Sequence, residues 1–152
     1  MITSQTDRVS AVLDRLRRAG HRTTLARRGV VHALGEAAEE RQHLSASEVH
    51  LRLTGRGRPV ELSTVHRVLT HLVDLGVAHV APVGGAATFG MAGRPHHQAV
   101  CQGCGGMRQL PTSAVAGTVT AARAVGVEVD PDGGNGGVVV YGWCASCRTR
   151  IT

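Results

Sequence analysis

Two short motifs decide the fold of this chain: Cys101-Gln102-Gly103-Cys104 and Cys144-Ala145-Ser146-Cys147, which contain all four of its cysteines. Two thiolates three residues apart bind one tetrahedral ion from a single turn, and a second such turn completes a closed four-sulfur Zn²⁺ shell. Gly103, Gly105 and Gly106 allow the tight backbone turn that this geometry needs. The long spacer between the motifs indicates that the metal joins the two ends of a small domain. We predict structural zinc bound by Cys101, Cys104, Cys144 and Cys147.

The cysteines have other interpretations. Two disulfides or a redox-active dithiol would be expected with a secretory signal or a thioredoxin-like strand and helix context, and the sequence shows neither. A zinc enzyme such as a nucleobase deaminase needs a His-x-Glu motif and an open coordination position. No His-x-Glu occurs in the sequence, so we predict that the protein is not an enzyme. A protein that senses peroxide by oxidation of its metal ligands stays open as an alternative.

Composition limits the remaining possibilities. The chain has 152 residues and only three aromatic ones, so its cores are built from Val, Leu and Ala. Small cores of this kind give a domain little stability, and a bound structural metal would add to it. All 17 basic residues are Arg, and twelve of them precede Gly76 against eight acids, which suggests a polyanionic partner for the first half. No apolar run is long enough for a membrane span, so we expect a cytoplasmic protein without a membrane partner.

The first half predicts four helices joined by short loops. Hydrophobic residues at helical spacing indicate a helix over residues 6–19, and Thr24 is the predicted N-cap of a second helix. Ser45 and Glu48 form a capping-box pattern before a third helix that ends near Leu53. Ser63 is the predicted N-cap of a fourth helix, which ends at Gly76.

A β-hairpin follows these helices directly. Its strands are expected over residues 77–83 and 86–89, with Gly84-Gly85 in the turn. Helices followed by such a hairpin are the plan of a winged helix, whose last helix enters the DNA major groove by its N-terminal end. The side chains that this plan places at double-stranded DNA can bond phosphates or base edges. They are Ser63, Thr64, His66 and Arg67.

The second half changes in character, with fourteen of the 20 glycines beyond Gly76. We predict strands at residues 97–101, 107–110, 127–129 and 138–143, a helix over residues 112–125, and a glycine-rich turn at residues 130–137. The strand that begins at residue 138 is a candidate for pairing with a second copy of the chain.

The predicted fold class is therefore α+β, with a winged helix followed by a small α/β domain. Residues 1–83 form the DNA-binding domain, residues 84–95 the end of the wing and a hinge, and residues 96–152 the dimerisation and metal-binding domain with its four-cysteine zinc site.

Several motifs together resemble the Fur (ferric uptake regulator) family, in particular its zinc uptake regulator branch. The segment from Leu62 to Leu69 resembles the family's recognition-helix motif, with His66 where a tyrosine is usual. Thr24-Leu25-Ala26-Arg27 matches the motif that places an arginine, here Arg27, at DNA. The segments from His43 to Ala46 and from His96 to Gly105 match the hinge side and the strand that leads into the first cysteine motif.

This resemblance implies a homodimeric, metal-responsive transcriptional repressor of metal-uptake or stress genes. It implies that a regulatory metal at the hinge brings two DNA-binding domains into register with a palindromic operator. The candidate regulatory ligands are His43, His79, His96 and His97.

The sequence departs from the family pattern at this regulatory site. Gln98 holds the place of a second histidine, and Ala92, or Gly90 before it, stands where a cysteine or glutamate is expected. Ala116 replaces a later ligand, which indicates that the family's auxiliary site is lost. A metal-independent DNA-binding relative is therefore the main alternative.

The chemistry of the histidines also favours a site for a transition-metal ion. No carboxylate lies between Asp74 and Glu128, and a shell rich in imidazole suits Zn²⁺ or Ni²⁺ better than Mg²⁺ or Mn²⁺. The candidate regulatory metals are Zn²⁺, Ni²⁺ and Fe²⁺. In an extended strand His96 and His97 face opposite ways, so both bind one ion only if the strand bends. The remaining helical histidines have no paired partners in the sequence and are interpreted as solvated: His21, His32, His50 and His71.

Overall fold

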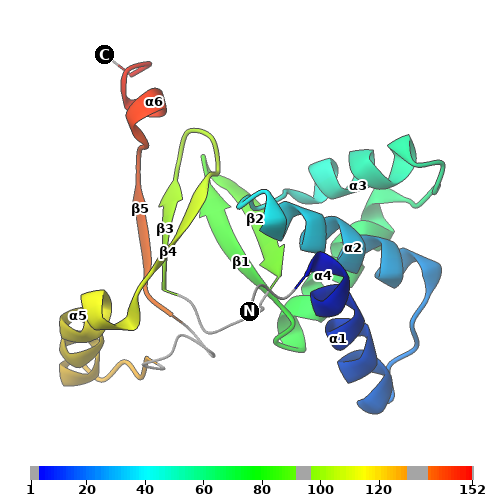
Figure 1. The fold of residues 1–152 in the computed structure, drawn as a ribbon, viewed down its shortest axis with the longest axis horizontal. Helices are drawn as coiled ribbons and strands as arrows, with labels where there is room; N and C mark the ends of the chain where they lie inside the picture. Colours follow the sequence, from blue (N-terminus) through cyan, green and yellow to red (C-terminus); the bar gives the residue numbers. More distant parts are fainter. Residues whose placement is uncertain (1–3, 92–96, 130–136, 152) are drawn as a thin grey trace. The chain divides into compact units, whose positions relative to one another are not determined.

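The computed structural model describes residues 4–91, 97–129 and 137–151, which form two compact units (Figure 1). We call Met1–Gly93 the helical unit and Arg94–Thr152 the sheet unit. The helical unit contains α1 (Gln5–Arg18), α2 (Leu25–Glu39), α3 (Ala46–Gly55), α4 (Leu62–Asp74), β1 (Ala78–Val83) and β2 (Ala86–Met91). The sheet unit contains β3 (His97–Cys101), β4 (Met107–Leu110), α5 (Thr112–Ala124), β5 (Val139–Gly142) and α6 (Ala145–Arg148). The predicted α+β class is confirmed.

Capping side chains set the starts of the first three helices. Ser4 begins α1 with a capping box to Asp7, and Thr24 accepts a hydrogen bond from the Arg27 N–H at 3.2 Å. Ser45 and Glu48 form the predicted capping box of α3. These bonds satisfy backbone N–H groups that have no partner inside the helix.

The fourth helix begins earlier than predicted. Its N-cap is Glu61, whose carbonyl accepts from Thr64 at 2.9 Å and from Val65 at 3.1 Å. The prediction that Ser63 caps this helix was therefore wrong, because the backbone already turns into the helix at Leu62. Ser63 lies in the first turn of α4 and is exposed.

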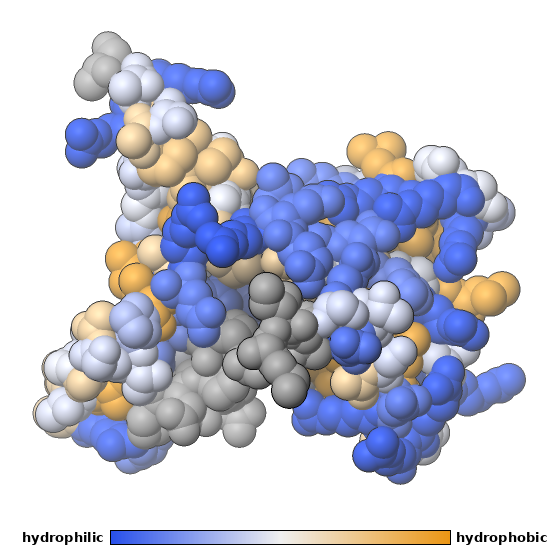
Figure 2. All heavy atoms as spheres, viewed as in Figure 1, coloured by the Kyte–Doolittle hydropathy of each residue, from blue (hydrophilic) through white to orange (hydrophobic). Residues whose placement is uncertain are grey.

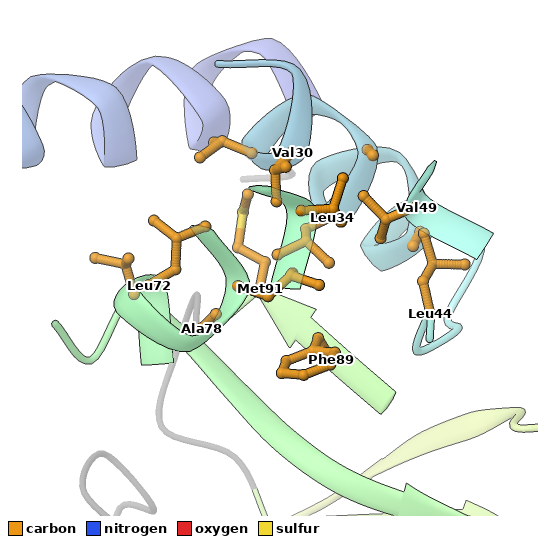
Figure 3. Packing of buried hydrophobic residues seen from close by; sticks show 14 of the residues in the cluster. Val30, Leu34, Leu44, Val49, Leu72, Ala78, Phe89 and Met91 are labelled. Atoms are coloured by element: carbon orange, nitrogen blue, oxygen red, sulfur yellow. The ribbon is translucent and has the colours of Figure 1, made fainter. Parts of the chain in front are cut away.

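The core of the helical unit lies between α2 and its neighbours. α2 contacts α1, α3, α4 and β2, and its side chains Val30 and Leu34 are fully buried. Figure 3 shows these two side chains above Phe89 and Met91 of β2. Burial of such side chains contributes about 1.5–3 kcal/mol each relative to exposure.

The wing is an antiparallel hairpin whose turn is Gly84-Gly85, as predicted. The two glycines have φ of 56° and 81°, the positive values that a two-residue hairpin turn requires. β2 runs on to Met91, so the second strand of the wing belongs to the helical unit. Leu44 pairs with Phe89 through backbone bonds of 3.0 and 2.7 Å, which places the segment before α3 along β2.

The sheet unit is built around β3, with the strand order β4-β3-β5. β3 pairs antiparallel with β4 and parallel with β5. α5 and α6 consequently follow the sheet at opposite ends, as Figure 1 shows. The short helix α6 was not predicted from the sequence.

The strand expected at residues 127–129 does not form. Val127 N–H instead donates to the Ala122 carbonyl at 3.0 Å, and Gly126 N–H donates to the Arg123 carbonyl at 3.0 Å. These two bonds are the Schellman motif that ends a helix, so the residues complete α5. The predicted glycine-rich turn falls mostly on residues 130–136, which lie outside the described part of the chain.

Candidate metal centre and nucleic-acid interface

The four cysteine sulfurs converge on one point. All four Sγ atoms lie within 4.8 Å of one another, and the Cys104 and Cys144 Sγ atoms are 4.0 Å apart. Four Zn–S bonds of about 2.3 Å at tetrahedral angles separate neighbouring sulfurs by roughly 3.8 Å, whereas a disulfide needs about 2.05 Å. The four residues are free thiols that fit a tetrahedral metal shell.

Strand pairing brings the two motifs together. β3 and β5 run parallel, with Cys101 opposite Gly142, so the turns that carry the two motifs leave the same end of the sheet. Gly103 permits their close approach, because a Cβ there would lie 2.8 Å from the Cys147 Cβ and 2.9 Å from its Sγ. A larger residue at this position would push the two turns apart.

The surroundings of the sulfurs shift the pKa values of Cys101 and Cys147 in opposite directions. The Cys144 N–H donates to the Cys101 Sγ at 3.3 Å, and this bond chiefly lowers the pKa of Cys101 to about 6. The hydrogen bond with the Cys144 thiol, together with burial, raises the pKa of Cys147 to about 12. Cys101 consequently loses its proton more readily than Cys147, and metal binding at this site releases protons.

A second group of chemistry-bearing side chains lies in the helical unit, where His43 meets His79. Their Nε2 atoms are 2.6 Å apart, and the rings meet edge to face with centroids 4.8 Å apart. His79 lies opposite Gly90 in the hairpin, and a Cβ on Gly90 would lie 2.5 Å from the His43 Cδ2. Gly90 therefore cannot act as a side-chain ligand, but its lack of a side chain makes room for both rings.

The environment of His43 keeps its ring neutral. The side chain is 5% exposed, and burial, with the charge of His79 as a smaller cause, lowers its pKa to about 4. Its Nδ1 is buried without a hydrogen-bond partner among the described residues. One Nε2 donates to the other, and the tautomers of the two rings decide which is the donor.

The other predicted regulatory residues belong to the sheet unit or fall outside the described residues. His97 is 1% exposed, and its Nδ1 accepts from the Val138 N–H at 2.9 Å. Gln98 is 6% exposed, with its Oε1 lacking a hydrogen-bond partner among the described residues. Ala116 lies on the exposed side of α5. His96 and Ala92 lie outside the described residues.

Helix α4 presents one polar face and one apolar face. Val65, Leu69 and Leu72 are buried against the core. Of the predicted DNA-binding residues on this helix, Ser63, His66 and Arg67 are exposed and Thr64 is half-buried. The Arg67 guanidinium lies 3.4 Å from the Thr64 hydroxyl, which accepts its hydrogen bond.

The other arginines of the helical unit differ in their availability. Arg27 is half-buried, and its Nη1 donates to the Arg22 carbonyl at 2.5 Å. Arg52 and Arg56 form ion pairs with Glu36 and Glu40, the shortest at 2.6 Å. These pairs connect α2 with α3, so their guanidinium groups are partly neutralised.

Among the described residues, no helix combines the length and apolar character that crossing a bilayer demands. Figure 2 shows hydrophilic side chains over much of the visible face of the helical unit and hydrophobic ones along β5.

Known proteins resemble this chain over most of its length. The model of the Ferric uptake regulator family matches residues 18–127. The ferric uptake regulation protein of Vibrio anguillarum is 30% identical over 139 residues, which cover 88% of this chain and 89% of that protein.

Two solved structures share the fold. The Vibrio cholerae ferric uptake regulator has a TM-score of 0.66 at 28% identity, covering 86% of this chain and 98% of that one. The Pseudomonas aeruginosa ferric uptake regulator, solved with manganese, has a TM-score of 0.65 at 29% identity, covering 88% of this chain and 97% of that one.

The family match includes the capped helix α2, the polar face of α4 and the first cysteine motif. The second cysteine motif lies beyond the matched residues, yet its sulfurs complete the tetrahedral shell. The chain therefore belongs to the ferric uptake regulator family of metal-responsive transcriptional regulators.

Proposed function

We propose that this protein is a repressor that binds a palindromic DNA operator as a homodimer in the cytoplasm. The observation that carries this proposal is the exposed face of α4, where Ser63, His66 and Arg67 lie opposite the buried residues that hold the helix. A helix supported in this way and followed by a hairpin suits insertion into a major groove. Arg67 would bond a guanine edge or a phosphate, and Thr64 a phosphate or a thymine methyl.

DNA binding is tested by removing the guanidinium of Arg67. We expect Arg67→Ala to weaken binding to the promoter of the protein's own gene by about 10–100-fold in a gel shift, since such contacts contribute about 1–3 kcal/mol. Arg108→Ala removes the same charge from an exposed position on β4 and serves as the control. An unchanged affinity for Arg67→Ala, or an equal loss in both variants, would contradict the assignment of α4 as the recognition helix.

Two kinds of metal site belong to the proposal. Cys101, Cys104, Cys144 and Cys147 would hold a structural Zn²⁺, for which the mutual distances of their sulfurs are suitable. His43 and His79 would hold a regulatory ion, and the sharing of that ion by His96 and His97 stays a prediction from the sequence. A site built on these two imidazoles would favour Zn²⁺, Ni²⁺ or Fe²⁺ over Mg²⁺, because these metals accept nitrogen ligands readily.

Regulation would follow from a difference in affinity between two conformations. Only a metal that binds the DNA-competent arrangement of the dimer more tightly than the other arrangement shifts the equilibrium. The competent arrangement would set two α4 helices about one helical turn of DNA apart, or a multiple of it.

One observation favours a second candidate, a regulator that binds DNA without a regulatory metal. Two nitrogens bound to one ion by bonds of about 2.0 Å at a tetrahedral angle lie roughly 3.3 Å apart. The 2.6 Å between the His43 and His79 Nε2 atoms is instead a direct hydrogen bond, so each Nε2 already has the other as its partner.

Operator binding during titration with Zn²⁺, Ni²⁺, Fe²⁺ and Mn²⁺ distinguishes a metal-responsive regulator from a metal-independent one. A metal-dependent gain that His79→Gln abolishes supports the regulatory site. Equal binding with and without chelator, while the cysteine-bound zinc is retained, supports the metal-independent regulator.

A further inference from the structure

Two histidines outside the sites described above are in contact. The rings of His21 and His71 meet edge to face, with centroids 5.2 Å apart and an interplanar angle of 78°. The expectation that these residues have no paired partner was therefore wrong. His21 does not lie on a helix but in the connection between α1 and α2, whereas His71 lies in the last turn of α4.

The backbone holds both residues in place. The His21 N–H donates to the Leu16 carbonyl at 2.9 Å, where Leu16 is a fully buried residue of α1. His71 lies beside Leu72, which anchors α4 in the core. Both residues are half-buried, so neither is sealed from solvent. The pair is thus positioned by packing and is also accessible to a small ion.

The distance between the rings fits a shared metal ion. Two imidazoles bound to one ion by bonds of about 2.0–2.1 Å at a tetrahedral angle have ring centroids roughly 5 Å apart. The observed 5.2 Å agrees with this value, and it leaves more room than the directly hydrogen-bonded pair of His43 and His79. Ligands that are imidazole nitrogens favour Zn²⁺, Ni²⁺ or Cu²⁺ over Mg²⁺ and Ca²⁺.

We propose that His21 and His71 form a further metal site, on the helical unit, for a divalent transition-metal ion. Water would complete the shell, because among the described residues the four cysteines are the only group of three or more side chains placed to bind one ion. The bound ion would connect the end of α1 to the end of α4 and would stabilise the helical unit by mass action.

The site is tested by Ni²⁺ titration of the full-length protein with zinc already bound to its cysteines. Calorimetry measures the number of Ni²⁺ ions bound, and NMR follows the ring signals of the histidines, which the paramagnetic ion broadens. We expect the His21 and His71 signals to broaden together and to saturate at one Ni²⁺ per chain.

Substitutions decide whether one ion is shared. We expect His71→Gln to abolish broadening at His21, His21→Gln to abolish it at His71, and each to weaken this binding step at least about 10-fold. The double variant should lose no more than either single one, because one site is removed only once. His50→Gln, on α3, is the control and should leave the step unchanged.

The proposal is overturned if the two rings broaden at different Ni²⁺ concentrations or if the two single losses add. It is also overturned if neither variant changes the binding, which would make the ring contact an aromatic contact only. Should His71→Gln fail to fold, His21→Gln gives the same answer, since His21 lies outside the helices. Because none of these readouts involves DNA, the result does not depend on the proposed operator binding.

Discussion

Gly90 is the residue on which the contact between His43 and His79 depends. A Cβ at this position would lie 2.5 Å from the His43 Cδ2 and 2.9 Å from the His79 Cε1. The His43 ring is buried, so it cannot withdraw from such a Cβ without repacking of its neighbours.

Gly90→Ala should therefore destabilise the helical unit by about 1–3 kcal/mol, the usual cost of overpacking. Gly55→Ala is the matched control, because a Cβ at the end of α3 meets open space. That control should be neutral or stabilising by up to about 1 kcal/mol. Urea unfolding followed by circular dichroism at the helix band measures both, and equal stabilities for the two variants would contradict the close approach.

The lowered pKa of His43 predicts a pH-dependent stability. The pKa is about 4 in the folded chain against an ordinary value of 6.5, so between these pH values the unfolded chain binds more protons. Stability present above pH 6.5 is then lost as the pH falls toward 4, by up to about 3 kcal/mol.

Urea unfolding at several pH values tests this expectation. The His43→Gln variant should show a shallower loss than the wild type over this pH range, while His50→Gln should resemble the wild type. Parallel curves for the wild type and His43→Gln would show that the His43 imidazole is not the group responsible.

At the scale of elements, β5 is an edge strand of a three-stranded sheet, with apolar side chains exposed on both of its faces. Val139, Val140 and Tyr141 are 38%, 49% and 39% exposed. An apolar edge strand readily pairs with another chain. This arrangement supports the proposed homodimer with β5 in its interface.

Val140→Lys should weaken that dimer by about 10-fold or more, because a charge in an apolar interface is left without a partner. Val80→Lys on β1 is a matched control, since Val80 is 50% exposed and lies in the other unit. Sedimentation across micromolar concentrations measures the dissociation constant. An unchanged dimer in Val140→Lys would place the interface elsewhere.

At the scale of the whole molecule, the two units depend on different sources of stability. The helical unit has an apolar cluster that draws on all four of its helices and its hairpin. The sheet unit buries few side chains beyond Val100, Val115 and Val119, so closure of the four-sulfur shell should supply much of its stability.

Removal of zinc by a chelator, or Cys104→Ser, should consequently unfold the sheet unit and leave the helical unit folded. Trp143 is the only tryptophan and lies beside Cys144, so its fluorescence reports on the sheet unit. Helical circular dichroism reports chiefly on the other unit. Ser146→Ala, within the second motif, is the control. Loss of both signals together would show that the two units unfold as one.

The sequence by itself determined the features that depend on neighbouring residues. Helix starts at Thr24 and Ser45, the hairpin turn at Gly84-Gly85 and the ligand spacing of the cysteine motifs follow from hydrogen bonds and backbone preferences within a few residues. The resemblance of several motifs also predicted the ferric uptake regulator family, which the comparisons confirmed.

Only the tertiary structure decided which distant side chains meet. The contacts of His43 with His79 and of His21 with His71 join residues far apart in the sequence, and the parallel pairing of β5 with β3 brings the two cysteine motifs to one end of the sheet. Local preferences do not carry this information, because the packing of separate elements sets the distance between such groups.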